Sequence, residues 1–394
     1  MPEHANPDPI SLALPEQFPK LATGPYFNHA AVGPWPRCTA EAVQAFAAEN
    51  LQHGPARYAE WIRRATELRT MLARLTGADG AADIALLKNT TECISAVAWG
   101  LDWRDGDNLV LPRDEFPSNR LPWLAQRRRG VEVREIDIRA AADAETALLG
   151  AMDSRTRLLS VSSVQWSDGF RLDLQRLGDA CHKRGALFFV DAIQQLGALP
   201  IDASACRIDY LAADAHKWLL GPEGIAVFYS SPSARPLLEL LQQGWHMVED
   251  AWNFQREDWT PAASARRFEA GSPNSIGQAA LHASVRLLLH HGPDHIAERV
   301  LENTDYLVRR LEEVPGVRLV SRVEPVRRSG IVTFAADGLP APELNRRLAA
   351  AGITCAVRGG GIRVSPHFYQ GEEDVGWFID CLEEVLAQGK GHRG

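Results

Sequence analysis

The sequence has no excess of positive charge and no hydrophobic run long enough to cross a membrane. Its 394 residues include 42 lysines and arginines against 50 aspartates and glutamates, a net charge of −8. This balance disfavours nucleic acid as a partner, because polyanions are bound by clustered basic residues. No apolar stretch approaches ~18 residues, so we expect no membrane contact. The start, MPEHANPDPI, lacks the basic and apolar regions of a signal peptide, which predicts a cytoplasmic protein.

The sequence also has few lysines, and its cysteines are not arranged in closely spaced pairs. The six cysteines include no Cys-x-x-Cys, which excludes a disulfide scaffold and the usual zinc spacings, so we expect a reducing compartment and no metal. Arginine carries nearly all the positive charge. Only lysine readily loses its proton and forms a Schiff base, so each lysine is a candidate for chemistry. The lysines are Lys20, Lys88, Lys183, Lys217 and Lys390.

Strand-like and helix-like stretches alternate through the middle of the chain. Several of the strands are continuous apolar runs, as in ALFFVDA. Such strands are buried on both faces, which is typical of a mostly parallel sheet covered by helices. The sequence therefore predicts an α/β fold. The expected strands are 83–89, 108–112, 131–138, 157–164, 186–192, 210–214 and 224–229.

The composition and the pattern of apolar residues divide the chain into three parts. Residues 1–20 are rich in proline and polar side chains and predict an N-terminal arm. Residues 21–274 carry the alternating pattern and predict the large domain. From 275 to 394, long helical stretches and short strands predict a smaller α+β domain.

A lysine and a carboxylate follow neighbouring expected strands. In an open α/β sheet, ligands bind beyond the carboxyl ends of the strands. Asp191 ends the strand at 186–192, and Lys217 follows the strand at 210–214. This pair fits a pyridine cofactor, because the lysine can form an imine with an aldehyde while the carboxylate keeps the ring nitrogen protonated. An isolated pair of this kind is equally consistent with a salt bridge.

Thr90 and Thr91 open the helix that follows the strand at 83–89. Hydroxyls and free backbone N–H groups at a helix N-terminus suit a phosphate group. The same residue types are ordinary helix caps, so on their own they leave both interpretations open.

Two longer segments carry a family resemblance. FFVDAIQQLGALPID, followed by DYLAADAHKWLLGPEGIAVFY, resembles the class V aminotransferase family of pyridoxal 5′-phosphate (PLP) enzymes. That family includes cysteine desulfurases, kynureninases and isopenicillin-N epimerase-like proteins. The resemblance runs from YFNHAAVGP at residues 26–34 to the final helix. It implies the PLP-dependent transferase fold of type I, PLP as cofactor, a small amino-acid substrate, and a homodimer with shared active sites.

The resemblance also implies roles for individual residues. Lys217 resembles the Schiff-base lysine, Asp191 the partner of the pyridine nitrogen, and Gln194 the donor to the phenolic oxygen. Phe116, in EFPSN, resembles the aromatic residue that stacks on the cofactor. Arg363 matches the arginine that holds the substrate carboxylate, a role that suits a bidentate guanidinium.

The remaining roles concern the phosphate and the edges of the site. His216, Thr90 and Thr91 resemble phosphate or cofactor-pocket residues. RRFEAGSPN resembles the segment that reaches the partner subunit's phosphate, through Gly271 and Ser272. The last set resembles residues that contact substrate or cofactor: Asn28, Trp166 and Trp245.

Two departures from the family pattern matter. Cysteine desulfurases of this kind carry a nucleophilic cysteine on a loop before the carboxylate arginine, but here Ala356-Val357-Arg358 runs through three glycines almost directly into Arg363. Cys355 precedes this segment and is expected to be a core residue. The sequence therefore predicts an enzyme that is not a persulfide-forming cysteine desulfurase.

The second departure is Asp214, where several relatives have a phosphate-binding serine. An ionised carboxylate would repel phosphate, so this group must be protonated, paired or turned away.

The expected activity is that of a PLP-dependent enzyme acting on an amino acid through Lys217 and Asp191. Transamination and cleavage at Cβ, as in a C–S lyase or a kynureninase-like enzyme, remain equally open. An amino-acid epimerase, or a PLP-binding protein without turnover, is the alternative.

Overall fold

The computed structural model describes residues 9–19, 21, 24–255 and 257–390. Its large sheet has seven strands in the order β1-β7-β6-β5-β4-β2-β3. Only β7 runs antiparallel to its neighbours, so the expected mostly parallel α/β sheet is confirmed. The strands are β1 (Ile84–Leu87), β2 (Asn108–Pro112), β3 (Glu132–Ile136), β4 (Thr156–Ser162), β5 (Leu187–Asp191), β6 (Tyr210–Asp214) and β7 (Ala226–Ser230).

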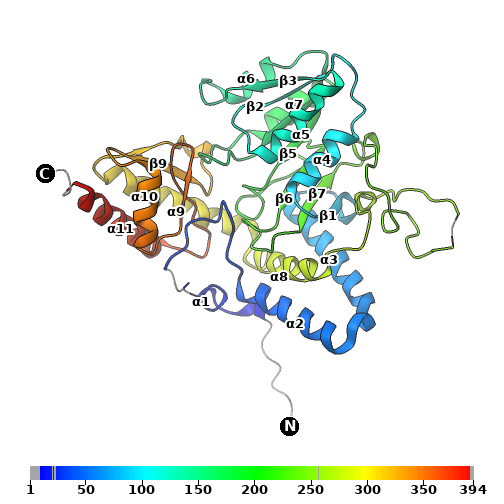
Figure 1. Cartoon of the computed structure of the whole chain (residues 1–394), viewed down its shortest axis with the longest axis horizontal. Coiled ribbons are helices and arrows are strands. Elements are labelled where there is room, and N and C mark those ends of the chain that lie inside the picture. The colour runs from blue at the N-terminus through cyan, green and yellow to red at the C-terminus, as the bar shows by residue number, and fades with distance from the viewer. Residues whose placement is uncertain (1–8, 20, 22–23, 256, 391–394) are drawn as a thin grey trace, which may run out of the picture.

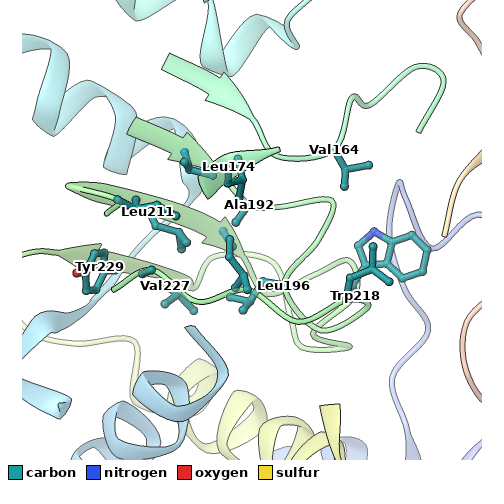
Figure 2. Close-up of a cluster of buried hydrophobic side chains, with 14 of the residues drawn as sticks. Val164, Leu174, Ala192, Leu196, Leu211, Trp218, Val227 and Tyr229 are labelled. Carbon is teal, nitrogen blue, oxygen red and sulfur yellow. The ribbon is translucent and has the colours of Figure 1, made fainter. Parts of the chain in front are cut away.

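Helices cover both faces of this sheet (Figure 1). One face packs on α3, α6, α7 and α8, and the other on α4 and α5. Figure 2 shows part of the first core, in which Leu211, Val227 and Tyr229 come from adjacent strands. The helices are α1 (Leu14–Gln17), α2 (Arg37–His53), α3 (Tyr58–Thr76), α4 (Thr90–Gly100), α5 (Leu121–Leu124), α6 (Ala144–Gly150), α7 (Leu174–Lys183), α8 (Ser275–His291), α9 (Pro293–Glu313), α10 (Ala341–Ala350) and α11 (Glu372–Lys390).

A second, antiparallel sheet lies to one side of the first (Figure 1). Its order is β10-β11-β9-β8, and its core is shared with α9, α10 and α11. This arrangement confirms the smaller α+β unit. The strands are β8 (Val317–Leu319), β9 (Val332–Ala336), β10 (Ala356–Arg358) and β11 (Gly361–Val364).

The two expected domain boundaries stay predictions, and the packing adds detail at both. Residues 1–8 and 20 of the expected arm lie outside the described residues. Within 9–19, α1 is followed by Phe18, whose ring stacks on Tyr369 at 3.7 Å between centroids. At the other boundary, α8 packs on the large sheet through Leu281 and Val285, although the predicted division assigns it to the small domain.

The segment after the arm joins the two sheets. Phe27 is fully buried in the core of the small sheet, and Asn28 bridges to Ser365 beside β11. Five residues later, the Gly33 N–H donates to the His216 carbonyl at 2.7 Å, next to the large sheet. A side chain at Gly33 would meet the Lys217 carbonyl oxygen at 2.5 Å, so only glycine allows this approach.

None of the described helices is long and apolar enough to span a bilayer.

Gly330, which precedes β9, is expected to be essential for the packing of the small sheet. A Cβ atom there would lie 2.3 Å from the Trp218 ring and 3.0 Å from Val300. Because a buried indole cannot yield, Gly330→Ala is expected to lower the free energy of unfolding by about 1–3 kcal/mol in urea titration. The control is Gly376→Ala in α11, where a Cβ meets nothing within 4 Å; it should keep or slightly raise stability. Equal stability of the two variants would contradict this packing argument.

Candidate active site

A cavity of about 470 Å³ opens at the carboxyl ends of β4, β5 and β6. The sequence places nine of the expected site residues on its wall, because each lies at or just beyond the end of an element. The nine are Thr90, Thr91, Phe116, Trp166, Asp191, Gln194, His216, Lys217 and Arg363.

Asp191 ends β5 and is 2% exposed. Its carboxylate accepts the Ile193 N–H at 3.0 Å. Burial raises the pKa of Asp191 to about 7, against the lowering effect of the Lys217 cation. Among the described residues, Asp191 and Lys217 form no ion pair, so the simple salt bridge is absent. A buried carboxylate without a cationic partner fits a protonated ring nitrogen.

Lys217 lies in the turn after β6 and is 8% exposed. Its Nζ lies 5.6 Å from the centroid of the Phe116 ring. Burial lowers the pKa of Lys217 to about 8, although Asp191 favours the charged form. A lysine of this kind loses its proton close to neutral pH, which suits a nucleophile or a general base.

Gln194 is held at both ends of its amide. Its Oε1 accepts the Trp218 indole N–H at 3.0 Å, and its Nε2 donates to the Ala30 carbonyl at 3.0 Å. The indole therefore fixes which way the amide points. One N–H of Nε2 remains, and Gln194 lines the cavity, which fits the expected donor to a phenolic oxygen.

The N-terminus of α4 lies at one end of the cavity. Its cap is Asn89, whose Oδ1 accepts the Glu92 N–H at 2.8 Å, so the two threonines are not needed for capping. The Thr90 hydroxyl is buried without a partner, and the Thr91 hydroxyl donates to Ser118 at 2.8 Å. The unpartnered Thr90 hydroxyl at the positive end of this helix suits a phosphate.

Arg363, on β11, reaches the cavity from the small sheet. It is 2% exposed, and one Nη donates to the Trp166 carbonyl at 2.7 Å. Its Nε is buried without a partner. Burial, and then the neighbouring Arg358, lower the pKa of Arg363 to about 10. A buried guanidinium with an open N–H is a strong site for a carboxylate.

The aromatic residues form one wall. Phe116 and Trp166 meet edge to face at 5.6 Å between centroids. The Trp166 indole donates to the Asp114 carbonyl at 2.8 Å, which fixes its orientation. Since Phe116 also faces the Lys217 amine, a planar ring bound there would contact its face.

The orphaned buried atoms test whether this cavity suits PLP. Thr90 Oγ1, Asp214 Oδ1, His216 Nδ1 and Arg363 Nε are all buried without a hydrogen-bond partner. Such atoms carry a desolvation cost unless a ligand satisfies them. Together with Asp191 and Lys217 on the same wall, this set of donors and acceptors fits a phosphorylated pyridine aldehyde and an amino-acid carboxylate, which Lys217 and Arg363 would hold.

Four expected residues lie outside this cavity, and their roles stay predictions, as do those of the nine residues on its wall. Asn28 has a buried Oδ1 without a partner but does not line the cavity. Gly271 and Ser272 line a second cavity of about 480 Å³, which shares Lys88 with the first. Trp245 packs against other aromatic residues of its own loop, Trp252 and Phe254.

Sequence reasoning missed several wall residues. Ser162 ends β4 beside Asp191, and Lys88 follows β1, so the search beyond strand ends could have found both. Arg358 was considered only as part of a shortened loop, yet it lines the cavity next to Arg363. Glu115 is buried and accepts the Ser162 N–H at 2.6 Å. No local signal in the sequence marks that contact.

Comparison with known proteins agrees with this geometry. The model of the family "Aminotransferase class-V" matches residues 25–377. A probable cysteine desulfurase of Methanothermobacter thermautotrophicus is 30% identical, over 94% of this chain and 97% of its own. The isopenicillin N epimerase of Streptomyces clavuligerus is 29% identical, over 92% and 94%.

Solved structures are similar as well. The cystine C-S lyase C-DES, in complex with its reaction product cysteine persulfide, superposes with a TM-score of 0.87. It is 26% identical, over 94% of this chain and 99% of that one. A second structure of the same protein shows glycine covalently linked to the PLP cofactor.

These relatives correct one prediction from the sequence. The exclusion of a persulfide-forming enzyme is wrong, because the similar proteins include cysteine desulfurases and a lyase whose product is cysteine persulfide. The exclusion assumed that a persulfide must form on a loop cysteine. In the C-DES complex the persulfide is a product amino acid, so the short segment before Arg363 does not bear on that chemistry. Cys355 itself packs at the small core, where burial raises its pKa to about 12.

The match spans nearly the whole chain, and the lysine, the aspartate and the arginine that the resemblance singled out line one cavity. This protein therefore belongs to the PLP-dependent class V aminotransferase family.

Proposed function

We propose that this protein is a PLP-dependent lyase that breaks the Cβ–S bond of a disulfide amino acid of the cystine type and releases a persulfide. The observation that carries the proposal is the pair of guanidiniums at one cavity. Arg363 is buried with an open N–H, and Arg358 is exposed on the same wall. One arginine can hold the carboxylate next to the reacting carbon, and the other a second carboxylate further out. Support comes from the likeness to a cystine C-S lyase.

Different residues of this chain bind the substrate and move the proton in the proposed reaction. Arg363 and Arg358 orient the substrate, and Phe116 and Trp166 limit the access of water on one side. Lys217, which loses its proton near neutral pH, takes the proton from Cα. When bound, PLP supplies the electron sink that makes this proton acidic.

The bond changes balance without an added oxidant or reductant. The electron pair of the Cα–H bond forms a Cα=Cβ bond, and the pair of the Cβ–S bond leaves with sulfur as a persulfide. The three-carbon fragment leaves as an unsaturated amine, which water hydrolyses to pyruvate and ammonia. One cystine and one water thus give one cysteine persulfide, one pyruvate and one ammonia.

Product analysis with L-cystine tests the proposal. We expect pyruvate and a persulfide in equal amounts. Pyruvate is measured by coupled reduction to lactate, and the persulfide by alkylation and mass spectrometry. Pyruvate should accumulate without an added keto acid. Conversion of the cofactor to its amine form, with turnover only on addition of a keto acid, would instead show an aminotransferase. Appearance of the D-amino acid alone would show an epimerase, and unchanged substrates would leave a binding protein without turnover.

The homodimer with shared active sites and the cytoplasmic location both remain predictions. The dimer would give a role to Gly271 and Ser272. Each lines a cavity next to the candidate site rather than the site itself, and a Cβ atom at Gly271 would have open space around it.

A further inference from the structure

Asp214 occupies an unusual place in the candidate site. It ends β6 and is 9% exposed. One carboxylate oxygen, Oδ2, accepts the N–H of Thr90, the first residue of α4, at 3.2 Å. The other oxygen, Oδ1, is buried without a well-formed hydrogen bond, and it lies on a residue that lines the cavity beside the Thr90 hydroxyl. A buried acceptor left open in this way points to a missing ligand.

The ligand expected at this end of the cavity is a phosphate. The N-terminus of α4 offers the Thr90 N–H, which bonds Asp214 in this structure, together with the Thr90 hydroxyl and the positive end of the helix dipole. The hydroxyls of Thr91 and Ser118 line the same wall. An ionised Asp214 competes with a phosphate for these donors and repels it, since two anions cannot share a buried site without a cation between them.

The groups around Asp214 show which of them can hold a proton. Among the residues that the structure describes, His216 is the imidazole near this carboxylate, and its Nδ1 lies 3.8 Å from Oδ2, too far for a hydrogen bond. Burial, and then the Lys217 cation, lower the pKa of His216 to about 4. The imidazole is therefore neutral at physiological pH and does not neutralise the carboxylate.

The remaining charged and titratable neighbours come from three elements. Asp191 on β5 favours the protonated form of Asp214, whereas Lys217, after β6, favours its ionised form. The buried Cys93 thiol on α4 is neutral, because burial raises its pKa well above the usual value. Burial is the largest effect, and it raises the pKa of Asp214 to about 6 before any phosphate is present. A phosphate dianion can only push it further in the same direction.

We propose that Asp214 takes up a proton when the phosphate ester of the cofactor binds, and that its Oδ1 then donates a hydrogen bond to a phosphate oxygen. The carboxyl thus acts as a neutral donor, and cofactor affinity depends on pH. The proton comes from solvent, so binding weakens as the pH rises. Where the free protein is ionised and the complex is not, the dissociation constant rises about tenfold per pH unit.

Calorimetry of the full chain, stripped of cofactor, tests the proposal. The probe is pyridoxine 5′-phosphate, which carries the ring and the phosphate but has no aldehyde to react with Lys217. Titration at pH 8 in two buffers of different ionisation enthalpy gives the number of protons taken up. We expect the wild type to take up about one proton more than Asp214→Asn. From pH 7 to 8.5, its dissociation constant should rise about tenfold per unit relative to that variant. Equal uptake and parallel pH profiles would overturn the proposal.

Three controls locate the proton. His216→Gln should retain the extra uptake, and its loss there would place the proton on the imidazole and contradict the assignment to Asp214. Pyridoxine, which lacks the phosphate, should show no difference between wild type and Asp214→Asn. Asp214→Ser, a smaller neutral donor, serves as the comparison if the asparagine variant does not fold. None of these measurements depends on the reaction that follows, so failure here leaves the lyase proposal intact.

Discussion

Replacement of Lys217 by alanine is expected to reduce turnover about 10²–10⁴-fold, the range associated with a positioned acid–base group. The reason is that Lys217 is the amine among the described wall residues that can move a proton near neutral pH. The second lysine of the wall, Lys88, lies beyond β1, which β7 separates from β6, the strand before Lys217. The measurement is the steady-state rate of pyruvate release from L-cystine. The visible spectrum of the bound cofactor should change as well, since its bond to the protein is lost.

Two further variants separate the chemistry of Lys217 from its charge. Lys217→Arg keeps a cation that cannot lose its proton, and it should be as inactive as the alanine variant. Lys183→Ala, an exposed change at the end of α7, should leave the rate unchanged. Wild-type turnover by either Lys217 variant would refute the assignment of the reacting amine, whatever the substrate proves to be.

Much of the fold follows from patterns that depend only on near neighbours in sequence. Apolar runs such as LFFVD are buried on both faces of the sheet, as the pattern predicts. The break between α2 and α3 falls at Gly54, which ends α2 with a positive φ of 54°. These features are local, so the chain itself specifies them.

The candidate site was predictable where its residues follow strand ends. Asp191 and Lys217 lie at adjacent strand ends because β5 and β6 pair in parallel. The contact between Arg363 and the Trp166 carbonyl joins residues 197 positions apart. No periodicity in the sequence encodes that contact, and only the family resemblance suggested Arg363.

Three of the expected site residues lie outside the cavity of the single chain. Gly271 and Ser272 were assigned by resemblance to a segment that reaches a partner subunit, and in the single chain they line a separate cavity. Trp245 likewise packs within its own loop. A resemblance transfers a role to a position in the sequence, but it does not say which cavity of the folded chain that position lines.

The persulfide prediction failed for a different reason. It treated the absence of a loop cysteine as the absence of a reaction, although a leaving sulfur needs no protein thiol when the substrate is already a disulfide. The two arginines next to the shortened segment are the feature that the sequence did contain. Their spacing on β10 and β11, where Arg358 pairs with Gly361, brings both guanidiniums to one cavity.

Replacement of Arg363 by alanine is expected to lower kcat/KM for L-cystine about 10²–10⁴-fold, mainly through a higher KM. That range corresponds to the loss of two charge-assisted hydrogen bonds of about 1.5–3 kcal/mol each. Arg363→Lys should recover part of the loss, because it restores the charge without the planar fork. Thermal unfolding of each variant shows whether the buried position tolerates the change.

Arg358→Ala is the matched control. Two substrates, one with a second carboxylate and one without, separate the effects of the two arginines. With L-cystine, which has a second carboxylate, kcat/KM should fall about tenfold, as for one exposed charge-assisted contact. With S-methylthio-cysteine, which lacks that carboxylate, Arg358→Ala should match the wild type while Arg363→Ala remains impaired. The two arginines then hold different carboxylates of one substrate. If Arg358→Ala lowered kcat/KM equally for both substrates, the two arginines would not hold different carboxylates. If Arg363→Ala were unimpaired, the carboxylate site could not lie at Arg363 on β11.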